Sequence, residues 1–274
     1  MTGISNRARC CAAFCLTALF LTGCSAPASG TKSEDSSFSS GNVGSAAQSA
    51  AESSWQFVDP ERQNVVFIGN SLTYTGGIPE RVGRLIDEKE VKIIDLTVSG
   101  YTLSQHVSRM ADPLYDEVFE YADAVIFQEY GSSGVGTTKS LKQLIVRFSE
   151  EAALYYLYTD FDISLKRYER ELKGLSRLTY IPTGYVYERL ITEGFPRQAM
   201  HMSEEDYHPS RLYGYASALT VNGVVFHCKA VDSDVSWLDR KTKNLLEGTP
   251  GLTRLQQIVD ETVADQAAGR LTYR

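Results

Sequence analysis

Five short apolar runs constrain the fold of this chain more than any other feature of its sequence. They cover residues 64–69, 91–98, 124–128, 152–158 and 178–182, and they are rich in β-branched and aromatic residues. Runs of this length and composition predict buried strands. Between them lie segments with apolar residues at helical spacing. Because parallel strands need long crossover connections, strands that alternate with helices predict an α/β fold.

The helical spacing recurs in several places along the chain. The apolar positions that show it are Ile78, Val82, Leu85 and Ile86; Leu141, Leu144, Ile145 and Phe148; Leu165, Tyr168, Leu172 and Leu175; and Leu252, Leu255, Val259 and Val263. A further helix is predicted after His208. We therefore expect a flavodoxin-like three-layer α/β/α sandwich with a five-stranded parallel sheet. In such sheets ligands bind at the carboxyl ends of the strands, which here carry Ser71, Gly100 and Gln128.

The first residues of the chain predict export. Arg7 and Arg9 precede an apolar stretch from Cys10 to Thr22, which ends in Leu21-Thr22-Gly23-Cys24. This is the layout of a secretory signal peptide over residues 1–23, and the stretch is too short to cross a bilayer core of roughly 30 Å as a helix. The segment resembles a bacterial lipobox. The resemblance implies that Cys24 is lipidated and anchors the chain to the bacterial cell membrane, facing the extracytoplasmic side.

The rest of the chain divides into a tether and one domain. Residues 24–54 are dominated by Ser, Ala and Gly, a composition that predicts a flexible tether. Residues 55–274 are enough for a single domain with a full core. Apart from the leader and Cys24, the only cysteine is Cys228, so no disulfide is expected within the domain.

Charge and motifs exclude several classes of function. The formal net charge is −7, which argues against nucleic acid as a partner. No phosphate-binding loop of the G-x-x-x-x-G-K-[ST] kind is present, and we expect no cofactor. His106 and His227 lack Cys, His or acidic partners at metal-ligand spacing, so they are interpreted as structural or solvated residues and no metal is predicted.

Ser71 is the candidate nucleophile. It follows the first predicted strand directly, and the lipase elbow G-x-S-x-G is absent because Thr73 stands where that motif has glycine. A serine hydroxyl needs a base to remove its proton. Of the four histidines, His208 is the best candidate, because it lies in an acidic loop, Glu204-Glu205-Asp206-Tyr207-His208, just before a helix that Pro209 can start.

These residues resemble the conserved blocks of the SGNH (GDSL-like) serine hydrolase family. Gly69-Asn70-Ser71-Leu72-Thr73 resembles the first block of its G-N-S-L-T branch, and Ile181-Pro182-Thr183-Gly184 also looks like that branch. The resemblance implies that the amide of Gly100, in the second block, contributes to the oxyanion hole. The third block is usually Gly-x-Asn-Asp, but here Gln128-Glu129 follows the strand, so Gln128 is the candidate for the third donor.

The last block of the family is Asp-x-x-His, and this chain departs from it. Glu205 stands three residues before His208 and Asp206 stands two before it. Glu205 could reach the ring with its extra methylene, Asp206 could replace it, or the site could be a Ser-His dyad.

The resemblance covers roughly residues 64–227. It implies an extracytoplasmic esterase with an acyl-serine mechanism, acting on an acetylated carbohydrate or cell-wall glycan. The alternative is a glycan- or solute-binding lipoprotein that kept the fold without catalysis.

Overall fold

The computed structural model describes residues 57–86, 89–129, 135–157, 172, 174–247 and 249–271. All of them belong to one compact unit, Glu52–Arg274. The predicted signal peptide, Cys24 and the tether lie outside the described residues, as do Leu165 and Tyr168 of one predicted helix. In the part of the chain that is described, no helix is long and apolar enough to cross a membrane.

All five predicted strands are present. They are β1 (Gln63–Ile68), β2 (Val91–Asp95), β3 (Ala124–Phe127), β4 (Ala153–Leu157) and β5 (Leu178–Ile181). They form one sheet in the order β2-β1-β3-β4-β5, and every neighbouring pair is parallel. This is the flavodoxin-like strand order, so the predicted fold class is confirmed.

The register of the central strands brings their carboxyl ends together. Ile68 at the end of β1 pairs with Phe127 at the end of β3, so residues 69 and 128 leave the sheet side by side. The chain after β2 also follows β1, because Leu96 and Val98 donate to the carbonyl oxygens of Phe67 and Gly69 at 2.9 and 3.0 Å. This continuation accounts for the longer strand that the sequence predicted over 91–98.

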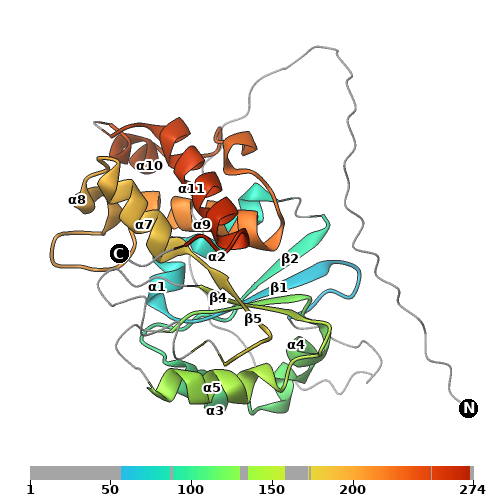
Figure 1. Ribbon diagram of the computed structural model, residues 1–274. Coiled ribbons are helices and arrows are strands. Elements are labelled where there is room, and N and C mark those ends of the chain that lie inside the picture. Colours follow the sequence, from blue (N-terminus) through green and yellow to red (C-terminus); the bar gives the residue numbers. More distant parts are fainter. Residues whose placement is uncertain are drawn as a thin grey trace, which may run out of the picture. The chain divides into compact units, whose positions relative to one another are not determined.

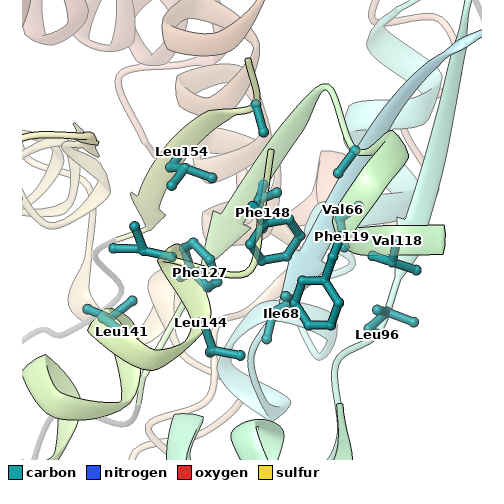
Figure 2. Close-up of a cluster of buried hydrophobic side chains, with 14 of the residues drawn as sticks. Val66, Ile68, Leu96, Val118, Phe119, Phe127, Leu141, Leu144, Phe148 and Leu154 are labelled. Atoms are coloured by element: carbon teal, nitrogen blue, oxygen red, sulfur yellow. The ribbon is translucent and has the colours of Figure 1, made fainter. Parts of the chain in front are cut away.

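One face of the sheet is covered by helices from the middle of the chain, as Figure 1 shows. These are α3 (Leu103–Arg109), the 3-10 turn η1 (Pro113–Tyr115), α4 (Asp116–Tyr121) and α5 (Val135–Ile145). Val66 and Ile68 of β1 point to this face and pack with Phe127, Phe119 and Phe148 in one buried cluster (Figure 2). Burial of these large apolar side chains is what joins the helices to the sheet.

The opposite face of the sheet is covered by α2 (Ile78–Leu85) and α9 (Arg211–Val225). Val65 and Phe67, the alternate residues of β1, pack there with Ile78 and with Ala218 of α9. Every residue of α9 after Arg211 is buried, because further helices cover its outer side. The remaining elements are α1 (Ser71–Tyr74), α7 (Thr183–Thr192), α8 (Arg197–Met200), η2 (Ala230–Asp232), α10 (Arg240–Leu245) and α11 (Leu252–Ala267).

Candidate active site

The turn after β1 presents Ser71 at the carboxyl edge of the sheet, as the first residue of α1. Asn70 caps this helix and is 2% exposed. Its Oδ1 accepts from the N–H of Leu72 at 3.1 Å, and its Nδ2 donates to the carbonyl oxygen of Tyr101 at 3.0 Å. The same side chain therefore shapes the turn and ties it to the loop after β2, which also carries Gly100.

His208 lies within hydrogen-bond distance of Ser71, although 137 residues separate them in the chain. The distance between Ser71 Oγ and His208 Nε2 is 2.8 Å. On the other side of the ring, His208 Nδ1 lies 2.6 Å from Oδ1 of Asp206, which also accepts from the backbone N–H of His208 at 3.0 Å. A carboxylate, an imidazole and a hydroxyl thus form one continuous hydrogen-bonded chain.

The carboxylate fixes the positions of the protons in this chain. An ionised carboxylate only accepts, so His208 Nδ1 carries the proton of the neutral ring and Nε2 is left to accept from the Ser71 hydroxyl. Asp206 stays ionised, because the hydrogen bonds from the N–H and the ring of His208 lower the pKa of its carboxyl. This tautomer is the one that a general base needs in order to remove the serine proton.

The two acidic candidates before His208 have different surroundings. Asp206 takes the position beside the ring, whereas Glu205 is exposed and makes no hydrogen bond to His208 in the described part of the chain. Of the two acids that the sequence left open, Asp206 therefore lies beside the ring and Glu205 does not, although Glu205 stands at the usual three-residue spacing. Asp206 reaches the ring because its side chain turns back onto the N–H of the residue two positions later, as aspartate does in Asx-turns.

A short backbone closure holds the loop that carries His208. The loop begins and ends at the antiparallel bridge between His201 and Pro209, where Met202 N–H donates to the His208 carbonyl oxygen at 3.0 Å. His201 is itself anchored, since its Nε2 lies 3.0 Å from the hydroxyl oxygen of Tyr187 in α7. The helix that follows starts at Arg211 rather than at Pro209, because Ser210 caps it.

Gln128 has a different role from the oxyanion donor that the sequence predicted. Its side chain is 1% exposed, and its Oε1 accepts from Asn70 N–H at 2.9 Å and from the Thr73 hydroxyl at 3.0 Å. Its Nε2 donates to the carbonyl oxygen of Glu129 at 2.7 Å. The structure thus uses the carboxamide to hold the Ser71 turn, and the prediction that Gln128 supplies an oxyanion donor is corrected.

Gly69 explains why Gln128 fits beneath the turn. A Cβ on residue 69 would lie 2.7 Å from Gln128 Oε1 and 3.0 Å from Thr73 Oγ1, so a side chain there would displace both groups. Glycine is required here because a side chain would not fit. The backbone conformation does not require it, since the φ of Gly69 is outside the left-handed region.

A second buried side chain holds the same turn, and the sequence did not assign it to the site. His106 of α3 is fully buried, and its Nε2 donates to the carbonyl oxygen of Gly69 at 2.8 Å. Burial lowers the pKa of His106; the hydrogen bond to Gly69 opposes this effect and the charge of Arg109 adds to it. His106 is therefore a neutral positioning residue, and the structural interpretation made for it from the sequence agrees with this contact.

Two backbone N–H groups near Ser71 are available to a ligand. Neither the N–H of Ser71 nor that of Gly100 donates to a protein acceptor among the described residues. Gly100 has φ +68°, a left-handed conformation that glycine adopts most readily, and a Cβ there would meet nothing within 4 Å. The surface beside Gly100 is thus open.

The remaining sequence candidates lie apart from this arrangement. His227 is exposed at the end of α9, and Cys228 is an exposed free thiol. Within the described ranges, no three His, Cys, Asp or Glu side chains are grouped as metal ligands would be.

No family model and no curated protein matches the sequence, but several solved structures do resemble it. The lipase Lip_vut3 from a goat rumen metagenome has 16% identity and a TM-score of 0.44, over 59% of this chain and 96% of that one. A member of the lipolytic protein G-D-S-L family from Veillonella parvula has 14% identity and a TM-score of 0.49, over 61% of this chain and 100% of that one.

A third similar structure is the C-terminal catalytic domain of peptidoglycan O-acetyltransferase A from Streptococcus pneumoniae. It has 10% identity and a TM-score of 0.42, over 63% of this chain and 97% of that one. The fold assignment itself rests on the strand order.

Proposed function

We propose that this chain is a serine esterase of the SGNH type that forms an acyl intermediate on Ser71. The observation that carries the proposal is the continuous chain of hydrogen bonds from Asp206 through His208 to the Ser71 hydroxyl, at 2.6 and 2.8 Å. An oriented imidazole in contact with a serine at the carboxyl edge of a parallel sheet is the arrangement that nucleophilic acyl transfer requires.

The proposed reaction has two halves. In the first, Ser71 Oγ attacks the carbonyl carbon of the ester while His208 Nε2 takes the serine proton. The proton then passes to the leaving alcohol as its C–O bond breaks, and the acyl group remains on Ser71. In the second half, His208 takes a proton from water, the resulting hydroxide displaces the acyl group as a carboxylic acid, and Ser71 regains its proton. Asp206 stabilises the imidazolium in both halves.

The negative oxygen of each tetrahedral intermediate needs hydrogen-bond donors. The N–H groups of Ser71 and Gly100 are the proposed donors, because both are without a protein acceptor in the described structure. A donor of this kind contributes about 3 kcal/mol to transition-state stabilisation. Gln128 and His106 have no part in the proton transfers and act by holding the turn that sets the position of the Ser71 N–H.

The finer proposal concerns substrate and location. The leader and the lipobox resemblance support an enzyme held by lipid on Cys24 at the extracytoplasmic side of a bacterial membrane. The family resemblance supports an acetylated carbohydrate or cell-wall glycan as the substrate.

Labelling with a fluorophosphonate tests the assignment. Ser71 should displace fluoride from the phosphorus, and mass spectrometry should find the phosphonyl adduct on the peptide that contains Ser71. The matched control is Ser104→Ala, at an exposed serine of α3, which should label like the wild type, whereas Ser71→Ala should not label. A folded wild-type protein that fails to label would favour the non-catalytic glycan- or solute-binding alternative.

A further inference from the structure

A cavity of about 270 Å³ is lined by residues from the loop after α1, from α2 and from the first residue of α9. The residues that line it include Tyr74, Gly77, Arg84, Arg211, Trp237 and Asp239. The hydrogen bonds described for Ser71, His208 and Asp206 involve none of these side chains.

Residues that follow both catalytic side chains in the sequence contribute to the lining of the cavity. Thr75 also lines it, and the N–H of Thr75 donates to the carbonyl oxygen of Ser71 at 2.9 Å, so this part of the lining lies one helical turn after the nucleophile in the chain. Arg211 lines it from the other side, three residues after His208. The cavity is thus bordered by residues four positions after Ser71 and three positions after His208.

The charges around the cavity do not balance. Asp239 is shared by two guanidinium groups, since its Oδ2 lies 2.9 Å from Arg211 and 3.5 Å from the buried Arg81. Burial acts to raise the pKa of Asp239, but hydrogen bonds from the Thr242 N–H and from Arg211 outweigh it and lower this pKa to about 2. The carboxylate therefore supplies one negative charge against two positive ones.

Arg84 adds a third guanidinium, which is paired with Glu80 at 2.9 Å. Glu80 is 69% exposed and Arg84 48% exposed, and an ion pair this open to water is worth little. Three arginines thus face two carboxylates. The short α10 that follows Asp239 adds Arg240, Lys241 and Lys243, all exposed, although the chain as a whole has a formal charge of −7.

Trp237 provides a rigid support for these cations. The guanidinium carbons of Arg81 and Arg84 lie 5.9 and 5.8 Å from the centre of the indole ring, within cation-π distance. The indole is itself held edge-on against Tyr215, with ring centres 5.8 Å apart. Arg84 is thereby kept at the wall of the cavity without being buried.

We propose that this cavity binds an oxyanion, a carboxylate or a phosphate, that the substrate carries next to the ester attacked by Ser71. Arg84 and Arg211 are the proposed ligands, because each is half exposed at the wall and a planar guanidinium matches either oxyanion in bidentate fashion. This inference rests on the proposed esterase function and narrows its substrate to acidic esters, such as acylated sugars that also bear a carboxylate or a phosphate.

Three aryl acetates test the proposal: 4-acetoxybenzoate, 4-acetoxyphenyl phosphate and the neutral 4-acetoxybenzamide. The readout is the ratio of kcat/KM for each anionic ester to that for the neutral one. Arg84→Gln and Arg211→Gln should each lower this ratio roughly tenfold, the effect of one charge-assisted hydrogen bond. Arg62→Gln is the matched control, because Arg62 is also ion-paired but lies at the opposite end of β1. The anionic ester whose kcat/KM ratio falls further identifies the oxyanion that the cavity binds.

A binding measurement separates this proposal from the esterase proposal. The chain has two tryptophans, Trp55 and Trp237, so in Trp55→Phe all tryptophan fluorescence comes from the cavity wall. Glucuronate or glucose 1-phosphate should change this fluorescence and glucose should not, and the change should be lost in Arg84→Gln. A fluorescence change with these anions in a protein that lacks esterase activity would overturn the proposed esterase function but would support the anion site. Esterase activity whose kcat/KM ratios are unchanged in the arginine variants, together with no fluorescence change with the anions, would overturn the anion site alone.

Discussion

Two side-chain conformations position the partners of Ser71 and His208. The choice between Glu205 and Asp206 depends on how the backbone folds the side chain back onto His208, and residue spacing does not determine this. The role of Gln128 depends on the direction of its carboxamide. Its oxygen faces Asn70 N–H, and this follows from the register of β1 and β3 rather than from its residue type.

The first prediction at the residue scale separates the two acids. Asp206→Asn should lower kcat for an aryl acetate by two to four orders of magnitude, roughly, because the amide favours the wrong tautomer of His208. Glu205→Gln should retain wild-type kcat, since Glu205 is exposed and does not contact the ring. Equal losses in the two variants, or no loss in either, would contradict the assignment of Asp206, and the second result would indicate a dyad.

The second prediction concerns pH and His106. Its pKa is lowered below the ordinary 6.5 in the folded protein, so unfolding takes up a proton and stability declines as pH falls below 6.5 towards the lower folded pKa. The slope attributable to His106 is at most about 1.4 kcal/mol per pH unit. Urea unfolding between pH 5 and 8 should show a shallower slope in His106→Gln and an unchanged one in the exposed control His227→Gln. The same slope in both variants would rule out this role for His106.

At the scale of elements, strands were easier to predict than helices. Buried parallel strands are continuous apolar runs, and all five were found. The helix α3 was not predicted, although Thr102 and Gln105 form a capping box that marks its start. The helix α7 was not predicted either, because its segment Thr183–Thr192 contains the aromatic and β-branched residues Tyr185, Val186 and Tyr187. These residues favour strands in isolation, and packing against α9 and α11 makes the segment helical.

One contact between elements sets the distance between the two catalytic loops. Gly76, in the loop after α1, packs against Gly214 of α9, and a Cβ on Gly214 would lie 1.9 Å from the Gly76 carbonyl oxygen. Gly214→Ala should therefore lower the unfolding free energy by about 1–3 kcal/mol and kcat by roughly a hundredfold, because the Ser71 loop is displaced. Gly174→Ala, where a Cβ meets nothing within 4 Å, is the control. Similar behaviour of the two variants would show that the contact does not position Ser71.

At the scale of the whole molecule, the alternation of strands and helices was sufficient to predict the architecture. Parallel strands joined by helices leave few topologies, and the observed order places the ends of β1 and β3 next to each other. The sequence could not predict the cavity lined by Arg84, Arg211 and Trp237, because these residues come from segments that only the packing of α2 and α9 brings together.

Membrane attachment is a prediction at this scale that rests on the sequence alone. If Cys24 is lipidated, Cys24→Ser should move the protein from the membrane fraction to the soluble fraction of a detergent-free lysate. Cys228→Ser is the control, because that thiol is exposed within the folded unit and should not affect fractionation. A Cys24→Ser protein that still sediments with membranes would contradict the lipobox interpretation.

Whether His208 activates Ser71 can be measured by the kinetics of Ser71→Ala, His208→Ala and the double variant on one aryl acetate. If the two side chains act as a single unit, each single variant should lose nearly all kcat/KM, and the double variant should lose little more, because residues of one catalytic unit are strongly non-additive. Circular dichroism should show that all three are folded. A His208→Ala protein that retains most of the wild-type kcat/KM would show that His208 does not activate Ser71.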